Sequence, residues 1–426
     1  MIDIQLIRDN SEEVINKLKA RNMDARELVS RLKDVDALRR QAQKELDDIL
    51  AESNAIARQI GELFKAGKGQ EAAAMKERSG ILKKEAKELQ AHLDEAGKEF
   101  MELIVRIPNL PHPLVPTGNS EADNEIVKTE GEAFEIGDHA LPHWELAKEY
   151  DLIDFEAGTK ITGAGFPVYK SRGAQMQRAL VSFFLDEAIR AGYTEYQPPL
   201  MVNEESAFGT GQLPDKDGQM YHITSDNLFL IPTSEVPITN LFRGTILKEE
   251  ELPLKCTAYS PCFRREAGSY GKDVRGLNRL HQFDKVEIVQ VTTPEKSYAA
   301  LDEMLEHVTS LLRKLELPFR ITRLCGGDLG FAAALTYDFE VWSAAQERWL
   351  EVSSVSNFET YQSNRLKLRY RTAKGKNQLA HTLNGSALAL PRILAALLEN
   401  KQSYDGIVLP EVLQGYMGVK KIQKTG

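Results

Sequence analysis

Apolar and small residues recur in three- and four-residue steps along residues 28–63, with one irregular pair of four-residue steps. This is the heptad spacing of a helix that buries one narrow stripe. A similar seam runs along residues 75–103, and Gly67 and Gly69 between the seams would break a helix. The seam positions are 28, 32, 35, 38, 42, 46, 49, 53, 56, 60 and 63, then 75, 79, 82, 86, 89, 93, 96, 100 and 103. The pattern predicts an antiparallel helical hairpin with arms of roughly 50 Å.

Such a hairpin has two interpretations. It could be a coiled coil that dimerises, or an arm that fills its own seam and leaves its outer face for another molecule. Basic residues on that face could contact phosphates, although the interleaved acidic residues also fit a plain solvated surface. The basic residues are Lys33, Arg39, Arg40, Lys44, Arg58, Lys65, Lys68, Lys76 and Lys83.

Residues 107–124 are rich in Pro, Gly, Asn and Asp and predict a linker, which divides the chain into domains 1–108 and 109–426. Strand-like stretches follow between residues 190 and 365, with few helices between them. They are 195–202, 227–236, 283–293, 335–344 and 348–361, and a helix is expected over 389–402. Consecutive strands favour an antiparallel sheet flanked by helices. The predicted fold class is therefore α+β.

The length and composition of the chain exclude several classes of protein. A chain of 426 residues exceeds what one core usually supports, and 42% hydrophobic with 27% charged residues is typical of a globular protein. The longest apolar runs are too short to cross a membrane, and the first ten residues lack the apolar core of a secretory signal, so we expect a cytoplasmic protein. The net charge of −9 offers no general attraction to nucleic acid, and no DNA partner is expected. Three sparse cysteines without a C-x-x-C pair predict neither disulfides nor a structural zinc.

Residues 262–287 carry the strongest chemical signal. Neither a Walker loop nor a G-x-G-x-x-G turn is present, so phosphate binding would depend on arginines. Arg264 and Glu266, two residues apart, would lie on one face of a strand, as a cation for an anionic group and an acceptor for an amine. Phe283 on the return strand offers a surface on which a purine could stack, and Arg279 and Glu287 flank it.

This stretch resembles the second motif of the class II aminoacyl-tRNA synthetases. Residues 196–201 ("YQPPLM") resemble the first motif, a dimer-interface element, and residues 384–398 ("NGSALALPRILAALL") resemble the third. Within the class, the chain is similar to the seryl-tRNA synthetases over essentially its whole length. The resemblance implies ATP-dependent activation of L-serine to seryl-adenylate and its transfer to tRNA(Ser), and also to tRNA(Sec). It further implies Mg²⁺ bound with ATP, a homodimer formed through the catalytic domain, and tRNA binding by residues 1–108.

The resemblance also assigns site residues. Arg264 would bridge the substrate carboxylate and the α-phosphate, Glu266 would hold the adenine amino group, and Phe283 would stack on the base. Arg392 would meet the γ-phosphate, and Arg264, Arg392 and Glu351 form the catalytic set. The implied ATP-binding residues are Arg264, Arg265, Glu266, Arg279, Leu280, Phe283, Glu351, Val352, Ser353, Ser354 and Arg392. The implied serine-binding residues are Thr233, Ser234, Glu235, Arg264, Glu287 and Ser386, with Glu287 and Ser386 as partners of the hydroxyl; Glu351 and Ser354 would hold Mg²⁺.

Some positions depart from the pattern of the family. Arg265 and Ser234 replace smaller residues, Leu335 stands where a lysine is frequent, and residues 163–166 lack an arginine. Two other functions stay open: a synthetase-like paralogue that loads a carrier other than tRNA, and a non-catalytic coiled-coil scaffold. The long hairpin argues against the first, and the presence of the key arginines argues against the second.

Overall fold

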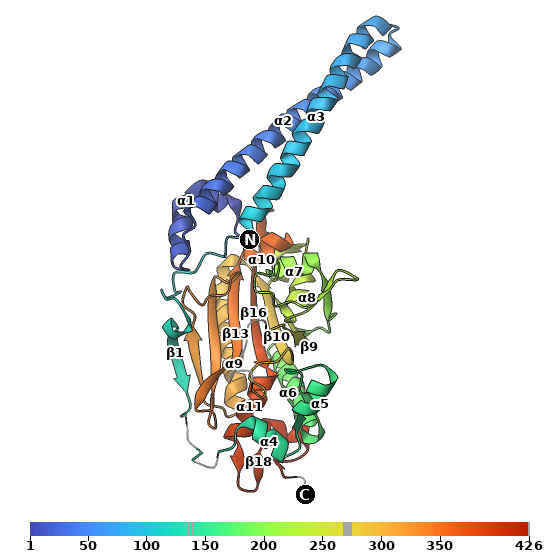
Figure 1. Cartoon of the computed structure of the whole chain (residues 1–426). Helices are drawn as coiled ribbons and strands as arrows, with labels where there is room; N and C mark the ends of the chain where they lie inside the picture. The colour runs from blue at the N-terminus through green and yellow to red at the C-terminus, as the bar shows by residue number, and fades with distance from the viewer. Residues whose placement is uncertain (134–135, 138–139, 267–274, 425–426) are drawn as a thin grey trace. The chain divides into compact units, whose positions relative to one another are not determined.

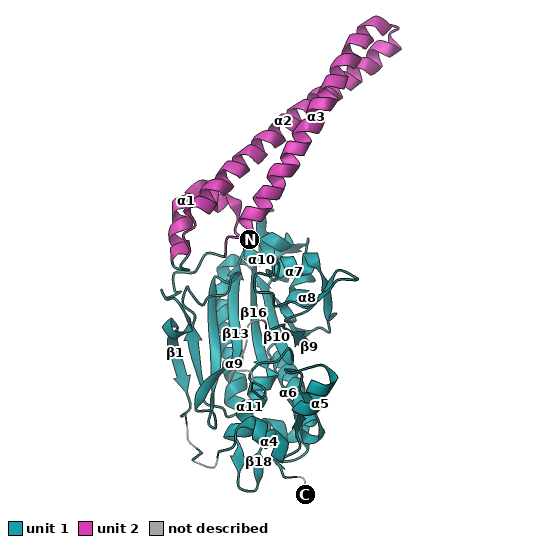
Figure 2. Cartoon of the chain, in the orientation of Figure 1, with its two compact units in different colours: residues 1, 20–22, 109–426 teal, residues 2–19, 23–108 magenta. Residues whose placement is uncertain are grey.

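The computed structural model describes residues 1–133, 136–137, 140–266 and 275–424. The chain forms two compact units (Figure 2): residues 2–19 and 23–108 make one, and residues 1, 20–22 and 109–426 make the other. We call them the arm unit and the sheet unit. Most of the glycine-bearing loop expected within 262–287, residues 267–274, lies outside the described residues.

The arm unit contains the predicted hairpin (Figure 1). Its helices are α1 (Ile4–Lys19), α2 (Arg26–Lys65) and α3 (Gly69–Ile104), and α2 packs along α3. Every predicted seam position is buried or partly buried except Leu38, which is 57% exposed. Gly67 turns the chain between the two long helices with φ +76°, a conformation that glycine adopts without steric cost. The heptad pattern therefore predicted the hairpin correctly, whereas α1 was not predicted.

A buried carboxylate organises the base of the hairpin. Asp36 on α2 is 1% exposed, and it accepts hydrogen bonds from Arg8 (2.7 Å), Arg39 (3.1 Å) and Arg40 (3.2 Å). Burial would raise the pKa of Asp36, but the bonds from Arg8 and Arg39 lower it below its usual value. Two of the basic residues expected to face solvent, Arg39 and Arg40, are thus engaged within the arm itself.

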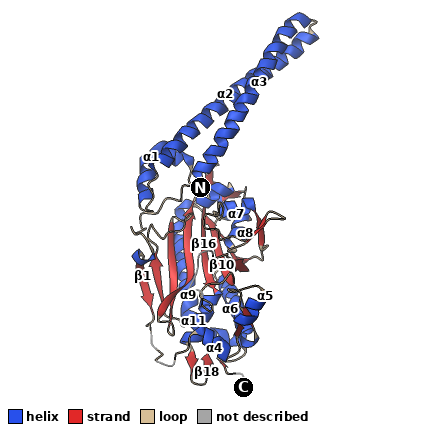
Figure 3. Cartoon of the chain, viewed as in Figure 1, coloured by secondary structure: helices blue, strands red, loops and turns tan. Residues whose placement is uncertain are grey.

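The sheet unit is built on eight strands in the order β1-β11-β12-β13-β16-β10-β9-β4 (Figure 3). All neighbours are antiparallel except β4 and β9, so the predicted antiparallel sheet has one parallel edge. The strands are β1 (Glu125–Glu130), β4 (Thr194–Glu195), β9 (Leu254–Phe263), β10 (Gln282–Thr292), β11 (Phe319–Arg323), β12 (Leu335–Ser343), β13 (Arg348–Glu359) and β16 (His381–Ala389).

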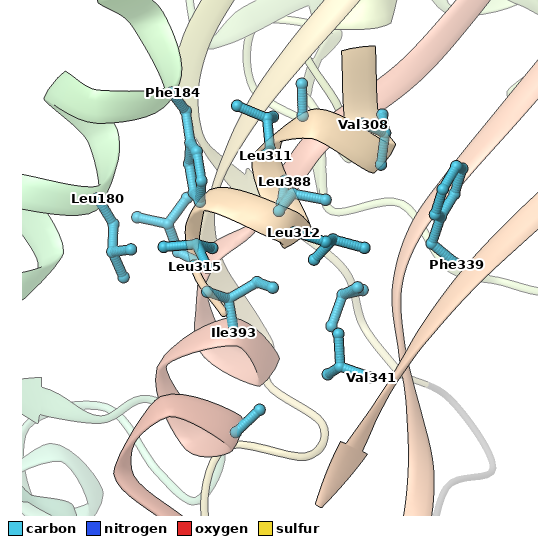
Figure 4. Packing of buried hydrophobic residues seen from close by; sticks show 14 of the residues in the cluster. Leu180, Phe184, Val308, Leu311, Leu312, Leu315, Phe339, Val341, Leu388 and Ile393 are labelled. Carbon is cyan, nitrogen blue, oxygen red and sulfur yellow. The ribbon is translucent and has the colours of Figure 1, made fainter. Parts of the chain in front are cut away.

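Three helices cover one face of this sheet: α6 (Ser171–Arg190), α9 (Ser297–Lys314) and α11 (Leu390–Asn400). Figure 4 shows the resulting core, in which Leu311, Leu312 and Leu315 of α9 lie among side chains of α6, α11 and β12. Val286 and Ile288 of β10 belong to the same core. Because side chains alternate along a strand, residues 283, 285 and 287 of β10 point to the other face.

Short elements complete the sheet unit. The helices are α4 (His143–Glu149), α5 (Phe155–Ile161), α7 (Glu204–Thr210), α8 (Glu235–Asn240), α10 (Tyr361–Leu366) and α12 (Glu411–Met417). The strands are β2 (Ile153–Asp154), β3 (Val168–Tyr169), β5 (Met201–Asn203), β6 (His222–Ile223), β7 (Leu228–Leu230), β8 (Ile246–Lys248), β14 (Arg369–Arg371), β15 (Asn377–Leu379), β17 (Gln402–Ser403), β18 (Gly406–Val408) and β19 (Lys421–Ile422).

Two strand predictions were wrong in extent. Residues 196–200, which contain two prolines, form no strand, since proline removes a donor from the ladder. Within 227–236 only β7 is a strand, because Glu235 begins α8. Across the part of the chain that is described, none of the helices is both long and apolar enough to cross a membrane.

Candidate active site

A cavity of about 780 Å³ opens in the sheet unit. It contains most of the residues that the sequence singled out, drawn from segments more than 150 residues apart. Those that line it are Thr233, Glu235, Arg264, Glu266, Arg279, Leu280, Phe283, Glu287, Glu351, Val352, Ser353, Ser354, Ser386 and Arg392.

Strand β10 supplies the floor. Phe283, Lys285 and Glu287 alternate with core residues and all three line the cavity. Asn384 and Ser386 of the neighbouring strand β16 also line the cavity. Glu287 is the cross-strand partner of Ser386. The sheet therefore places these polar side chains at fixed register positions.

The geometry of Arg264 and Glu266 differs from the prediction. Strand β9 ends at Phe263, so neither residue belongs to a strand, and Glu266 has φ +47°. One backbone hydrogen bond lies beyond the end of β9: the Arg264 N–H donates to the carbonyl of His281 at 2.9 Å. The two side chains reach the cavity because the backbone bends there, and not because they share a strand face.

Two arginine side chains that line the cavity, those of Arg264 and Arg279, are held by specific contacts. The Arg264 guanidinium carbon lies 5.2 Å from the centre of the Phe283 ring. Arg279 donates to a Glu266 carboxylate oxygen at 2.9 Å. A cation thus rests on an aromatic face, and an acceptor is fixed by a second cation.

Arg392 enters from the first turn of α11. Its Nε donates to the backbone carbonyl of Asn278 at 3.0 Å, and its Nη1 donates to the carbonyl of Glu351 at 2.8 Å. The Glu351 carboxylate lies 3.6 Å from the same Nη1. Arg264 and Arg392 therefore line one shared cavity, which is the arrangement that anion binding requires.

A buried acidic pocket forms another part of the cavity. Lys285 and Glu287 make an ion pair there, and the Thr233 hydroxyl donates to Glu287 at 2.9 Å. Glu235 accepts a bond from the Gln362 amide at 2.6 Å. Burial, and then the Glu287 carboxylate, raise the pKa of Glu235 to about 7. Glu287 is neutralised by a cation, whereas Glu235 has a neutral amide as its hydrogen-bond partner.

Two predicted residues do not line the cavity. Ser234 is fully buried, and its hydroxyl is 2.6 Å from that of Ser260. Arg265 is exposed, and its backbone N–H donates to the carbonyl of Gln219. The structure thus brings together all predicted site residues except these two.

The sequence and the geometry can now be compared with known proteins. Residues 1–111 match the seryl-tRNA synthetase N-terminal domain, and residues 221–401 match the class II tRNA synthetase core domain (G, H, P, S and T). The serine–tRNA ligase of Salinibacter ruber is 51% identical over 424 residues, which cover 99% of both chains. The chain belongs to the seryl-tRNA synthetase family.

Solved structures of this family agree in fold. A seryl-tRNA synthetase from Pyrococcus horikoshii, complexed with ATP, matches with a TM-score of 0.91 and 33% identity over the full length of both chains. A cytoplasmic serine–tRNA ligase from Naegleria fowleri, in complex with AMP, matches with a TM-score of 0.86 and 28% identity, covering 100% of this chain and 99% of that one.

Two of the residues that line the cavity of this seryl-tRNA synthetase fold, Glu351 and Ser354, carry side-chain oxygens, and the Glu351 carboxylate is the one that lies beside Arg392. Asp338 of β12 is the cross-strand partner of Ser354, and its Oδ1 is buried without a hydrogen-bond partner in the described part of the chain. Burial, and then the nearby Glu351 carboxylate, raise the pKa of Asp338 well above its usual value. Carboxylate and hydroxyl oxygens of this kind suit Mg²⁺, which protein sites bind through one or two carboxylates together with phosphates.

Sequence reasoning missed several residues of the site. Lys285 could have been found, because it lies on β10 midway between Phe283 and Glu287, on the same strand face. Gln362 and Arg365 come from α10, far away in sequence, and nothing in their surroundings pointed to the cavity. Asp338 looked like one polar position in an amphipathic strand.

The remaining departures from the family pattern have structural explanations. Leu335 is 1% exposed and belongs to the main core. In the segment 163–166, Phe166 stacks on His281 with ring centres 5.3 Å apart, and Gly165 accepts a bond from the His281 backbone N–H. Both positions thus support the structure around the cavity.

Proposed function

We propose that this protein activates L-serine with ATP and transfers the seryl group to the 3′ end of tRNA(Ser). The observation that carries the proposal is that Arg264, Phe283 and Arg392 share one cavity with the acidic pocket around Glu235 and Glu287. The arginines suit a triphosphate, the aromatic ring suits a purine, and the acidic pocket suits the ammonium group of an amino acid. The family of the chain supports this assignment.

Two steps make up the reaction. A carboxylate oxygen of serine attacks the α-phosphorus of ATP, the bond from that phosphorus to the bridging oxygen breaks, and pyrophosphate leaves. A ribose hydroxyl of the tRNA then attacks the carbonyl carbon of the adenylate, and AMP leaves. Both steps involve charge on phosphate oxygens, so positioned cations supply most of the stabilisation.

The observed contacts support a role in ATP binding for the residues at one end of the cavity. Arg264, resting on Phe283, would meet the α-phosphate while adenine stacks on the same ring. Glu266, held by Arg279, would accept a bond from the adenine amino group. Arg392, fixed by two backbone carbonyls, would meet the γ-phosphate. Leu280, Val352 and Ser353 also line the cavity.

Mg²⁺ fits the oxygen ligands beside this end. Glu351 and Ser354 would hold it together with the phosphates, and the buried Asp338 oxygen belongs to the neighbouring strand. When bound, the ion neutralises phosphate charge and polarises the phosphoryl group. The chain's own residues orient the triphosphate, through Arg392, and the serine carboxylate, through Arg264.

The acidic pocket would select serine. Glu235 is suited to the ammonium group, and Glu287 and Ser386 to the hydroxyl. A site that bonds a substrate hydroxyl rejects the analogue without it by roughly 10⁴-fold, because its own buried polar groups would stay unpaired. Alanine would be excluded in this way, and threonine by the extra methyl group.

The arm unit would bind tRNA by shape and phosphate contacts. Lys44, Arg58, Lys65 and Lys83 are exposed and form no ion pair within the described residues, which supports this role. tRNA(Sec) would be a second substrate. Residues 1–108 would thus form the tRNA-binding domain and residues 109–426 the catalytic domain, with the protein in the cytoplasm beside its tRNA.

A homodimer would form through the sheet unit. Tyr196, Leu200 and Met201 lie in the stretch that resembles the first motif of the class, and they are 36%, 37% and 48% exposed. Clustered apolar side chains of this size commonly mark an interface.

The test is exchange of labelled pyrophosphate into ATP with each amino acid supplied singly, followed by charging of a tRNA pool. We expect exchange with serine alone, and serine attached to tRNA(Ser). Exchange that is independent of serine, or stronger with another amino acid, would refute the assignment.

A further inference from the structure

Behind the wall of the cavity lies a buried polar network centred on His143 and Glu399. Both side chains are 0% exposed, and His143 Nδ1 lies 2.7 Å from Glu399 Oε1. The same oxygen accepts the backbone N–H of His143 at 2.9 Å, and Ser343 donates to the other carboxylate oxygen. A charged group this far from water is stable only when it is fully hydrogen-bonded.

The second ring nitrogen fixes the protonation state of His143. The backbone N–H of Leu277 donates to Nε2 at 2.8 Å, so this nitrogen carries a lone pair. The ring is therefore neutral, and its single proton, on Nδ1, is donated to Glu399. Burial would raise the pKa of Glu399, but the hydrogen bond from His143 and the other contacts lower it below the usual value, so the carboxylate stays charged.

The backbone beside Leu277 is shaped around this ring. Gly276 has φ +65°, and a Cβ there would lie only 2.2 Å from His143 Nε2. A second hydrogen-bonded connection runs through Gln346. Its amide nitrogen donates to Glu399 at 2.9 Å, and its amide oxygen accepts from the Asn278 side chain at 3.0 Å. Two independent connections thus join residues 276–278 to Glu399.

This segment is also part of the cavity wall. Leu277, Asn278 and Arg279 line the cavity, and the carbonyl of Asn278 accepts the Nε of Arg392. Arg392 and Glu399 are seven residues apart on α11, which is about two turns, so they lie on the same side of the helix. One end of the helix orients Arg392 toward the cavity, and the other end anchors the segment that holds it.

We infer that His143 and Glu399 are positioning residues for ATP, which act through Leu277 and Asn278 to hold Arg392 and Arg279 against the phosphates and Glu266. The inference rests on the proposed function, because it assigns the network a part in ATP activation. Neither His143 nor Glu399 is among the residues that line the cavity. The residues of the serine pocket, Thr233 and Glu287, make no contact with this network in the described structure.

The test is serine-dependent pyrophosphate exchange by the full chain, with the KM for ATP and the KM for serine measured separately. His143→Leu removes both hydrogen bonds of the ring. We expect its KM for ATP to rise about tenfold or more while its KM for serine stays within about twofold. His143→Gln should recover most of the loss, because its amide offers one donor and one acceptor at a spacing like that of the ring nitrogens.

Two further variants separate positioning from stability. Gln346→Leu removes the hydrogen bonds that connect Asn278 to Glu399 through Gln346, and it leaves His143 in place. We expect this variant to raise the KM for ATP about threefold. It provides a test even if the His143→Leu variant does not fold. Gln290→Leu removes a buried bond to the Tyr193 hydroxyl on the same sheet, and it should lower stability without changing the KM for ATP.

The inference is overturned if Gln346→Leu or a folded His143→Leu leaves the KM for ATP unchanged, or raises both KM values equally. A wild-type chain without serine-dependent exchange would instead overturn the proposed function, and the inference with it.

Discussion

Lys285 and Glu287, two residues apart on β10, form an ion pair that is almost completely buried at the floor of the cavity. Their side chains point the same way because they are separated by one strand period. A buried pair of this kind is costly to break, since the remaining charge has no water to solvate it.

Replacement of Lys285 by Met should therefore destabilise the protein by about 3 kcal/mol and raise the KM for serine. The double variant Lys285→Met/Glu287→Leu should be less destabilised than the single variant, because no unpaired charge remains. Chemical denaturation of the two variants and the wild type measures this difference. Equal stability of the Lys285→Met variant and the wild type would mean that the pair is not formed.

The pH dependence of serine binding should reflect Glu235. Its pKa of about 7 means that the carboxyl is mostly charged at pH 8 and mostly neutral at pH 6. Only the charged form attracts an ammonium group, so the KM for serine should rise about tenfold from pH 8 to pH 6. The Glu235→Gln variant should bind serine weakly at both pH values, and a pH profile like that of the wild type would rule out Glu235 as the titrating group.

Basic residues of the arm should divide into two groups. The triple variant Lys44→Ala/Arg58→Ala/Lys83→Ala should lower tRNA affinity and reduce the slope of log affinity against log salt, by about one for each phosphate that the arm no longer binds. Arg40→Ala should instead lower the stability of the arm, because Arg40 is bound to Asp36. Filter binding over a salt series distinguishes the two, and an unchanged slope in the triple variant would exclude these residues from the tRNA surface.

Removal of residues 30–100 should abolish tRNA charging and leave serine-dependent pyrophosphate exchange largely intact. The reason is that every residue of the candidate site belongs to the sheet unit. Circular dichroism is needed to show that the shortened protein is folded. Loss of exchange in a folded protein would contradict this division of labour.

The sequence predicted what depends on local periodicity. The heptad seams predicted α2 and α3, and the strand-like composition of residues 283–293 predicted β10, because both signals come from residues that are neighbours in sequence. The parallel edge of β4 was not predictable, since strand direction depends on the path of the chain between strands. Irregular backbone was also missed, as at Glu266, where the strand was expected to continue.

Prediction of the site residues from the sequence had the same limit. Arg264, Phe283 and Arg392 were found through motifs, whereas Gln362 and His143 were not, because their partners lie 100 residues or more away in sequence. Long-range hydrogen bonds leave no local pattern in the chain. Only the folded structure shows that such residues complete the pocket and its supporting wall.

The central claim is that the guanidinium groups of Arg264 and Arg392, which line one cavity of the sheet unit, bind the triphosphate of ATP. The most direct measurement is kcat/KM for ATP in serine-dependent pyrophosphate exchange, compared between the wild type, Arg264→Ala and Arg392→Ala. Arg320→Ala is the control, because it breaks an ion pair with Glu340 on the same sheet outside the cavity. We predict losses of about 10²–10³-fold for the first two variants and little change for the control; full activity of folded Arg264→Ala and Arg392→Ala proteins would contradict the account.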